Sequence, residues 1–233
     1  GVADSSTSGS SASVQGDMIV RGQTNLLLDT AGTTRAAFDS SGNFVFNEAS
    51  NDQDFRIESD GATHMLFVDA GNNRVGIGEA SPDVPLHLTT SSTGTAVKAE
   101  SSNASSSAGP GLVLYRNSSS PADNDETGSV TFEGRNDASE DVAYALIQSR
   151  IMDASDGTED GALSISAMFG GTNRSRIDFN NTETNVNQSG QNLDFRVETD
   201  SKTHALFVDA GNNQVLFNTS SARSTSGVTS AFQ

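Results

Sequence analysis

The stretch "THMLFVDAGNNRVGIG" occupies residues 63–78, and a closely similar stretch, "THALFVDAGNNQVLFN", occupies residues 203–218. The similarity extends upstream, because residues 54–75 and 194–215 are identical at 16 of 22 aligned positions. Agreement at this level over a constant offset of 140 residues indicates a true internal repeat. A degenerate third version is predicted at "AAFDSSGNFVFN", residues 36–47.

The repeated unit predicts a three-stranded meander. In the first copy "FRIE" at 55–58 alternates apolar and charged residues, as a half-buried strand does. "DG" at 60–61 is a strong hairpin-turn signal. Residues 65–68 then read as a second strand that is apolar on both faces, "DAGNN" at 69–73 reverses the chain, and residues 75–77 begin a third strand.

A meander of about 24 residues is not stable by itself in water. The two clear copies are too far apart in sequence to stack on one another as solenoid repeats do. We therefore expect symmetry-related chains to cover each meander, and we predict a shared assembly core with these members: Phe55, Ile57, Phe67, Val68, Val75, Ile77, Phe195, Val197, Phe207, Val208 and Val215.

Composition supports a shared core and excludes several classes of protein. Apolar residues make up 33% of the 233 positions, Trp and Cys are absent, and the formal net charge is −17. The absence of Cys excludes disulfides and thiolate metal sites, and the acidic balance disfavours binding to nucleic acid or to anionic membranes. Solubility or adaptation to salt is the ordinary explanation of the acidity, and cation binding is the specific alternative. Because the chain begins with Gly rather than Met, we expect a processed product or a portion of something longer.

Short apolar runs separated by Gly, Asn, Ser and Thr predict an all-β chain without long helices. The expected organisation is a Ser-rich N-terminal segment that is a linker or an attachment strand, a first β-repeat region, a linker, a middle β domain, a second β-repeat region and a C-terminal tail. Their respective ranges are 1–16, 17–97, 98–109, 110–182, 183–222 and 223–233.

The middle domain is expected to contain five strands. The candidates are "GLVLYR" (111–116), "GSVTFEGR" (128–135), "VAYALIQSRIMD" (142–153), "GALSISAMF" (161–169) and "SRIDFN" (175–180). A short helical turn within "SEDVAYALIQSRI" is an alternative for part of this region. The strands predict a sandwich-like or prism-like unit.

Acidic loops provide weak candidates for a calcium site. "DASDGTEDG" offers Asp153, Asp156, Glu159 and Asp160 around a glycine, and calcium prefers six to eight oxygen ligands from such loops. The spacing departs from the EF-hand pattern, so a polar hairpin turn is the favoured interpretation, and the same holds for "ADNDE" at 122–126. We therefore predict no metal and no other cofactor.

Two further side-chain patterns have a functional and an ordinary interpretation. The repeat-equivalent His64 and His204 could form a three-ligand metal site on a three-fold axis, but support of each hairpin through the adjacent threonine is favoured. The carboxylate pairs Glu58/Asp60 and Glu198/Asp200 could serve a glycosidase. Both pairs belong to predicted hairpin turns, and a sugar-cleaving groove tends to use aromatic platforms, so no catalytic residues and no enzymatic activity are expected.

The sequence resembles a known family at "DFRIESDGATHMLFVDAGNNRVGIGEASP" (54–82) and at "PADNDETGSVTFEGRNDASEDVAYALIQSRIMDASDGTEDGALSI" (121–165). These stretches are similar to repeats, and to the blocks between them, in tail fibres and other appendage proteins of marine bacteriophages such as cyanophages. The two stretches comprise 74 of the 233 residues, about a third of the chain. It implies an elongated, intertwined homotrimer whose strands are shared between chains, located on the virion and taking part in host attachment.

The expected function is thus that of a structural or adhesive virion fibre subunit, from a tail fibre or a capsid fibre. Expected partners are identical chains, other virion proteins and a host receptor or surface polysaccharide, with no nucleic acid and no membrane insertion. One alternative is a self-assembling extracellular filament in which the Ser-rich N-terminus adds as a strand to the next subunit. Another is a polysaccharide-degrading tailspike.

Overall fold

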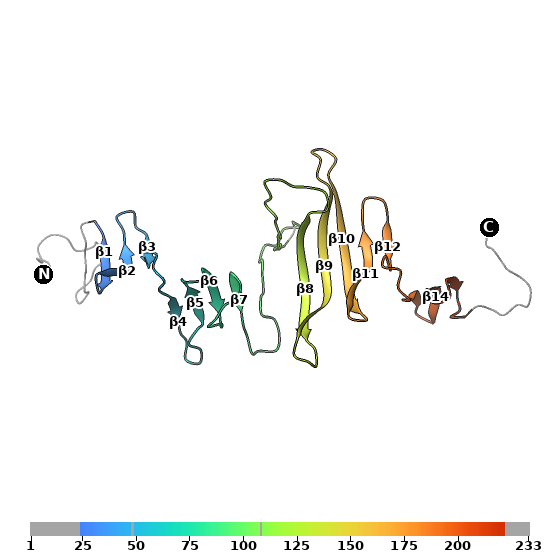
Figure 1. Cartoon of the computed structure of the whole chain (residues 1–233), viewed down its shortest axis with the longest axis horizontal. Coiled ribbons are helices and arrows are strands. Elements are labelled where there is room, and N and C mark those ends of the chain that lie inside the picture. The colour runs from blue at the N-terminus through green and yellow to red at the C-terminus, as the bar shows by residue number, and fades with distance from the viewer. Residues whose placement is uncertain (1–23, 48, 108, 222–233) are drawn as a thin grey trace, which may run out of the picture. The chain divides into compact units, whose positions relative to one another are not determined.

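The structure, a computed structural model, describes residues 24–221 except 48 and 108. The regular structure in this part of the chain is all β strand, which confirms the prediction of an all-β chain (Figure 1). Within the same residues no helix is long and apolar enough to cross a membrane. The predicted N-terminal segment 1–16, the run "DMIVRG" (17–22) and the tail 223–233 lie outside the described residues.

The chain divides between Ser105 and Ser106 into two compact units, and this boundary falls within the segment predicted as a linker. The first unit contains two antiparallel meanders. The first meander has the order β1-β2-β3 and the second has the order β4-β5-β6, extended by β7. Their bounds are β1 Leu26–Thr30, β2 Thr33–Phe38, β3 Phe44–Phe46, β4 Phe55–Ile57, β5 Leu66–Asp69, β6 Arg74–Ile77 and β7 Leu86–Leu88.

The sequence pattern did not predict strand β7. This strand pairs in parallel with β6, and an irregular loop connects the two. Pro82 in this loop is fully buried, and Arg74 Nη1 donates a hydrogen bond to the Pro82 carbonyl at 2.7 Å. The loop passes so close to β6 that a Cβ at Gly76 would lie 2.3 Å from the Glu79 carbonyl oxygen. The glycines of "VGIG" therefore leave space for the returning chain.

The second unit contains a five-stranded antiparallel sheet and a third meander. The sheet, here called the middle sheet, has the order β12-β11-β10-β9-β8, and the third meander has the order β13-β14-β15. Their bounds are β8 Glu126–Arg135, β9 Asp141–Asp153, β10 Asp160–Phe169, β11 Thr172–Phe179, β12 Thr184–Val186, β13 Phe195–Thr199, β14 Lys202–Asp209 and β15 Gln214–Phe217.

Two expectations about the middle region need correction. Residues 111–116, "GLVLYR", form no strand, because they have no ladder partner within the described chain. Within one chain the strands form one sheet rather than the two packed layers of a sandwich. The region in which a helical turn was an alternative is strand β9.

All three meanders close the hairpin between their second and third strands with the same carboxylate-centred turn. The carboxylate of Asp69 accepts hydrogen bonds from the backbone amide and the side-chain amide of Asn72, both at 2.9 Å. Asp209 and Asn212 repeat these contacts, both at 2.8 Å. In the first meander Asp39 accepts the corresponding bonds from Asn43 at 2.9 and 2.8 Å. The degenerate third copy is thereby confirmed.

A second polar contact ties this turn to the start of each meander. Asp54, immediately before β4, accepts the amide of Ala70 at 3.0 Å, and Asp194, immediately before β13, accepts the amide of Ala210 at the same distance. Asn25, immediately before β1, accepts the amide of Ser40 at 3.1 Å. The repeated unit is therefore a meander in which an Asx side chain (Asp or Asn) fixes the first strand to the distal turn.

The repeat also extends further upstream than sequence identity indicates. Asn47 after β3 and Asn187 after β12 both have positive φ, 60° and 61°. Each donates its side-chain amide to a carbonyl four residues later at 2.7 Å and accepts the amide of that same residue at 3.1 Å. The β11–β12 hairpin of the middle sheet is thus joined to the third meander by the same Asn-centred junction that joins the first meander to the second.

Candidate functional site

The candidate site is the apolar side of the single-layer sheets. In the second meander the register aligns Phe55, Val68 and Val75 in one row that continues to Leu86. In the third meander it aligns Phe195, Val208 and Val215. Because side chains alternate between the two faces of a strand, Ile57, Ile77 and Val197 lie on the same face as these rows, which we call the apolar face.

The apolar face of each meander lies open. Val215 is 59% exposed and Phe217, from the neighbouring row, is 63% exposed. Soluble proteins seldom leave contiguous apolar patches uncovered, and such patches mark interaction sites. Of the nine predicted core residues on these two faces, five are exposed and four are half-buried in the described chain. The exposed ones are Ile57, Ile77, Phe195, Val197 and Val215, and the half-buried ones are Phe55, Val68, Val75 and Val208.

Phe67 and Phe207 are the two predicted core residues that the structure places elsewhere. They pair with Arg56 and Arg196, respectively, on the opposite face of the meanders. They are only 8% and 7% exposed, respectively, so this chain buries them by itself. Sequence alternation could not separate the two faces, because "LFV" is apolar at three consecutive positions.

The repeat-equivalent histidines support these buried phenylalanines. The His64 ring meets the Phe67 ring edge-on with centroids 5.1 Å apart, and His204 meets Phe207 in the same way at 4.9 Å. The Nδ1 atom of each imidazole lies within hydrogen-bond distance of the preceding threonine hydroxyl, at 2.9 and 3.0 Å. The predicted hairpin-supporting role of both histidines is confirmed.

The middle sheet carries its own apolar row across all five strands. The register places Val130, Ile147, Ile165, Ile177 and Val186 directly opposite one another in sequence from β8 to β12. Rows of β-branched residues of this kind stabilise cross-strand pairing. In the described part of the chain no second sheet pairs or packs with this row, and Val130 and Val186 at its two ends are 41% and 47% exposed.

A run of phenylalanines connects the apolar faces of the first two meanders. Phe38 stacks on Phe44 with centroids 4.2 Å apart and planes 9° apart. Phe44 contacts Phe46, and Phe46 contacts Phe55 at the start of β4, each at 4.5 Å between centroids. The predicted core omitted Phe38, Phe44 and Phe46. Their positions in the repeat correspond to Val68 and its neighbours, which could have indicated them.

The acidic turns are held by their own hydrogen bonds. The Asp153 carboxylate accepts the Ser155 amide at 2.8 Å and the Thr158 hydroxyl at 3.4 Å. A hydrogen bond from the Ser155 side chain, followed by the one from its amide, is the main cause of a lowered Asp153 pKa. Asp160 accepts the Asn181 side-chain amide at 2.9 Å. Asp156 and Glu159 are exposed. Among the described residues no three His, Cys, Asp or Glu side chains group as a metal site would require.

The carboxylate pairs considered for hydrolysis sit in ordinary surface contacts. Glu58 forms an ion pair with Arg56 at 2.8 Å, and Glu198 forms one with Arg196 at 2.8 Å. Asp60 and Asp200 are exposed in the loops between the first two strands of each meander. Both glutamates are exposed on the strand surface, each beside an arginine of its own strand.

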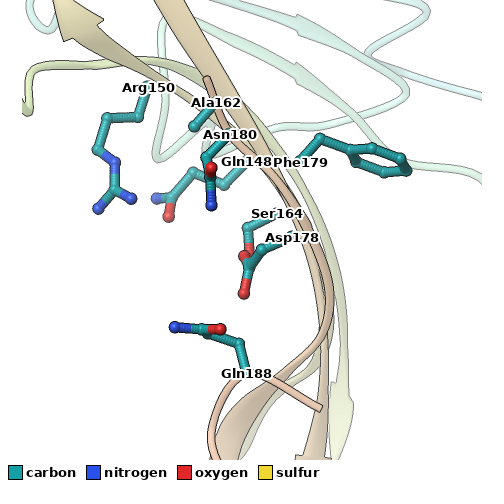
Figure 2. A pocket seen from close by; sticks show the side chains of 8 residues that line it. All are labelled: Gln148, Arg150, Ala162, Ser164, Asp178, Phe179, Asn180 and Gln188. Atoms are coloured by element: carbon teal, nitrogen blue, oxygen red, sulfur yellow. The ribbon is translucent and has the colours of Figure 1, made fainter. Parts of the chain in front are cut away.

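The opposite face of the middle sheet is polar and has a hollow of about 190 Å³ that the sequence did not indicate. Figure 2 shows Gln148, Arg150, Ser164 and Asp178 on the side of the hollow, whereas the Phe179 ring is turned away from them. The register places Gln148, Ser164 and Asp178 in one row. The two faces of this sheet therefore differ sharply in polarity.

In comparison with known proteins, no family model, no curated protein and no solved structure matched this chain.

Proposed function

We propose that this chain is a subunit of a homo-oligomeric β fibre, a trimer in its simplest form, in which copies of the chain cover one another's apolar faces. The observation that carries the proposal is that each sheet is a single layer with one apolar face and one more polar face. Among the described residues, each meander and the middle sheet present an apolar face on which no second sheet packs. Three chains around one axis bury such faces against a common core in the way that closed symmetric oligomers do.

The polar turns fit the same proposal. In every meander the Asp–Asn turn and the Asx contact before the first strand satisfy backbone amides locally. A meander held in this way keeps its shape at the surface of an assembly, while its apolar face supplies the adhesive energy. The stiffness of a fibre then comes from repeated small units rather than from one large core in each chain.

The biological role that we propose is mechanical and adhesive. The resemblance of residues 54–82 and 121–165 to appendage proteins of marine bacteriophages supports a virion fibre, from the tail or the capsid, that takes part in host attachment. In this proposal the chain has no catalytic function, and its partners are identical chains, other virion proteins and a host receptor or surface polysaccharide.

The native mass of the purified protein tests the proposal. We expect a discrete multiple of 24.2 kDa, with three copies as the simplest outcome, in native mass spectrometry and in sedimentation at micromolar concentration. A compact monomer that unfolds cooperatively at high dilution would refute it. Indefinite polymers that disappear when residues 1–15 are deleted would favour the filament alternative instead.

A further inference from the structure

The segment Gly111–Arg116, here called the unpaired segment, is extended but belongs to no sheet. Its side chains are among the most exposed apolar groups of the described chain: Leu112, Val113 and Tyr115 are 81%, 82% and 78% exposed, respectively. Among the described residues, the backbone of Leu112, Val113 and Leu114 makes no hydrogen bond. Extended backbone with free donors and acceptors can pair with a strand edge.

The side-chain pattern of the unpaired segment is that of an interior strand. Leu112 and Leu114 would lie on one side of an extended chain, and Val113 and Tyr115 would lie on the other. Strands that are apolar on both sides normally lie between two covering layers. The sequence of this segment therefore suits burial, whereas the structure of one chain leaves it exposed.

Side-chain contacts hold the end of the unpaired segment near the beginning of β8. Arg116 Nη1 donates to the Glu126 carbonyl at 3.0 Å, and the Arg116 guanidinium lies 3.0 Å from the Asp125 carboxylate. Leu114 lies over Gly128, where an added Cβ would come within 2.8 Å of the leucine Cβ. The segment thus lies over the start of its own β8 without forming a ladder along it.

Strand β8 is an edge strand of the middle sheet, and no other described strand pairs with its outer side. It is ten residues long, whereas the other edge strands of the four sheets are three to five residues long. A six-residue strand can therefore pair along its full length only with β8. Val130 and Phe132 are exposed on this edge strand, and a long free edge of this kind is normally covered.

We propose that the unpaired segment of one copy adds to the free edge of β8 in a second copy and forms a sixth strand of that copy's middle sheet. This inference rests on the proposed function, since it requires an assembly of identical chains. Each copy contributes one unpaired segment and binds one from a neighbour. Copies related head to tail by a rotation axis can therefore form a closed ring in which every unpaired segment and every β8 edge is paired. The added strand would satisfy the edge backbone and place Leu112 and Leu114 beside Val130 and Phe132.

Because the chain contains no cysteine, disulfide cross-linking can test the pairing directly. In the proposed pairing Leu112 and Leu114 lie on the apolar face, so Val113 shares the other face with Ser129 and Thr131. Two differently tagged populations are co-assembled, one carrying Val113→Cys and the other carrying Ser129→Cys or Thr131→Cys, and are then oxidised gently. Paired strands bring such cysteines within the 4.4–6.8 Å Cα separation that a disulfide needs.

The matched control is Asn185→Cys on β12, because Asn185 lies in the same cross-strand row as Ser129 but at the opposite edge of the sheet. We expect covalent dimers between differently tagged chains with a β8 cysteine, and at least tenfold fewer with Asn185→Cys. If Val113→Cys impairs assembly, Tyr115→Cys on the same side of the segment replaces it. Equal yields at both edges would overturn the proposal.

Native mass distinguishes failure of this inference from failure of the proposed function. A multichain particle without cross-links to β8 would refute strand addition and leave the fibre proposal intact. A monomer would refute both. A chain carrying both Val113→Cys and Thr131→Cys that forms only an intrachain disulfide would show that the segment pairs with its own β8, which also overturns the inference.

Discussion

The two faces of the middle sheet should respond differently to the loss of an apolar side chain. Phe179 lies on the apolar face and is 41% exposed, whereas Leu146 pairs with Thr131 and Ser166 on the polar face and is half-buried. The variants Phe179→Ala and Leu146→Ala therefore both remove apolar contacts within the chain. They differ in what an assembly would add to each side chain.

The size of the difference follows from the exposed area. A buried aromatic side chain covers about 200 Å², so about 80 Å² of Phe179 remains to be covered by another copy. At about 25 cal/mol per Å² this is about 2 kcal/mol for each chain and about 6 kcal/mol for a trimer. Since about 1.4 kcal/mol is a factor of ten, the assembly constant should fall by about four orders of magnitude.

Sedimentation over a dilution series measures this effect. We expect Phe179→Ala to dissociate at a much higher concentration than the parent protein, and Leu146→Ala to dissociate close to the parent concentration. Thermal unfolding of the dissociated chains should be similar for both variants, which controls for folding. Identical assembly constants for the two variants would show that the apolar face is not an interface, and the central argument would fail.

Two further predictions concern the local devices of the fold. Hydrogen bonds from the side chains of Asn43, Asn72 and Asn212 are the main cause of a lowered pKa at Asp39, Asp69 and Asp209, respectively. A carboxyl with a lower pKa in the folded state stabilises the fold above its unfolded pKa and loses that contribution as pH falls through the folded value. As the pH is lowered below about 4, the melting temperature should therefore decrease, and it should decrease less steeply in an Asn72→Ala/Asn212→Ala variant. An unchanged dependence of the melting temperature on pH in that variant would contradict the role of the turns. In the second meander, Gly76→Ala should lower the free energy of unfolding in chemical denaturation by about 1–3 kcal/mol through overpacking, because its Cβ would collide with the Glu79 carbonyl. Gly61→Ala, which has open space around its Cβ, should lower it far less. Equal losses of unfolding free energy would count against the close approach of the β6–β7 loop.

Local patterns in the sequence were sufficient for the repeated unit. Alternation in "FRIE", the reversal at "DAGNN" and the related reversal at "DSSGN" each depend on neighbouring residues, and the structure contains the corresponding strands and turns. Strands β8 to β11 were predictable for the same reason. The parallel strand β7 was not predicted, because its pairing depends on the path of an irregular loop around the buried Pro82.

The amino-acid sequence by itself determined an all-β chain, the presence of meanders and the carboxylate turns that close them, because strand alternation and Asx turns are local interactions. Only the tertiary structure decided which side of each strand is covered. Register assigns Phe67 and Phe207 to the buried face and leaves Val68, Val208 and their row partners on the open one. The tertiary structure likewise left "GLVLYR" (111–116) without a partner strand among the described residues. Where consecutive residues are all apolar, the face that becomes the core depends on which strands pair, and that is a property of the whole fold rather than of the local sequence.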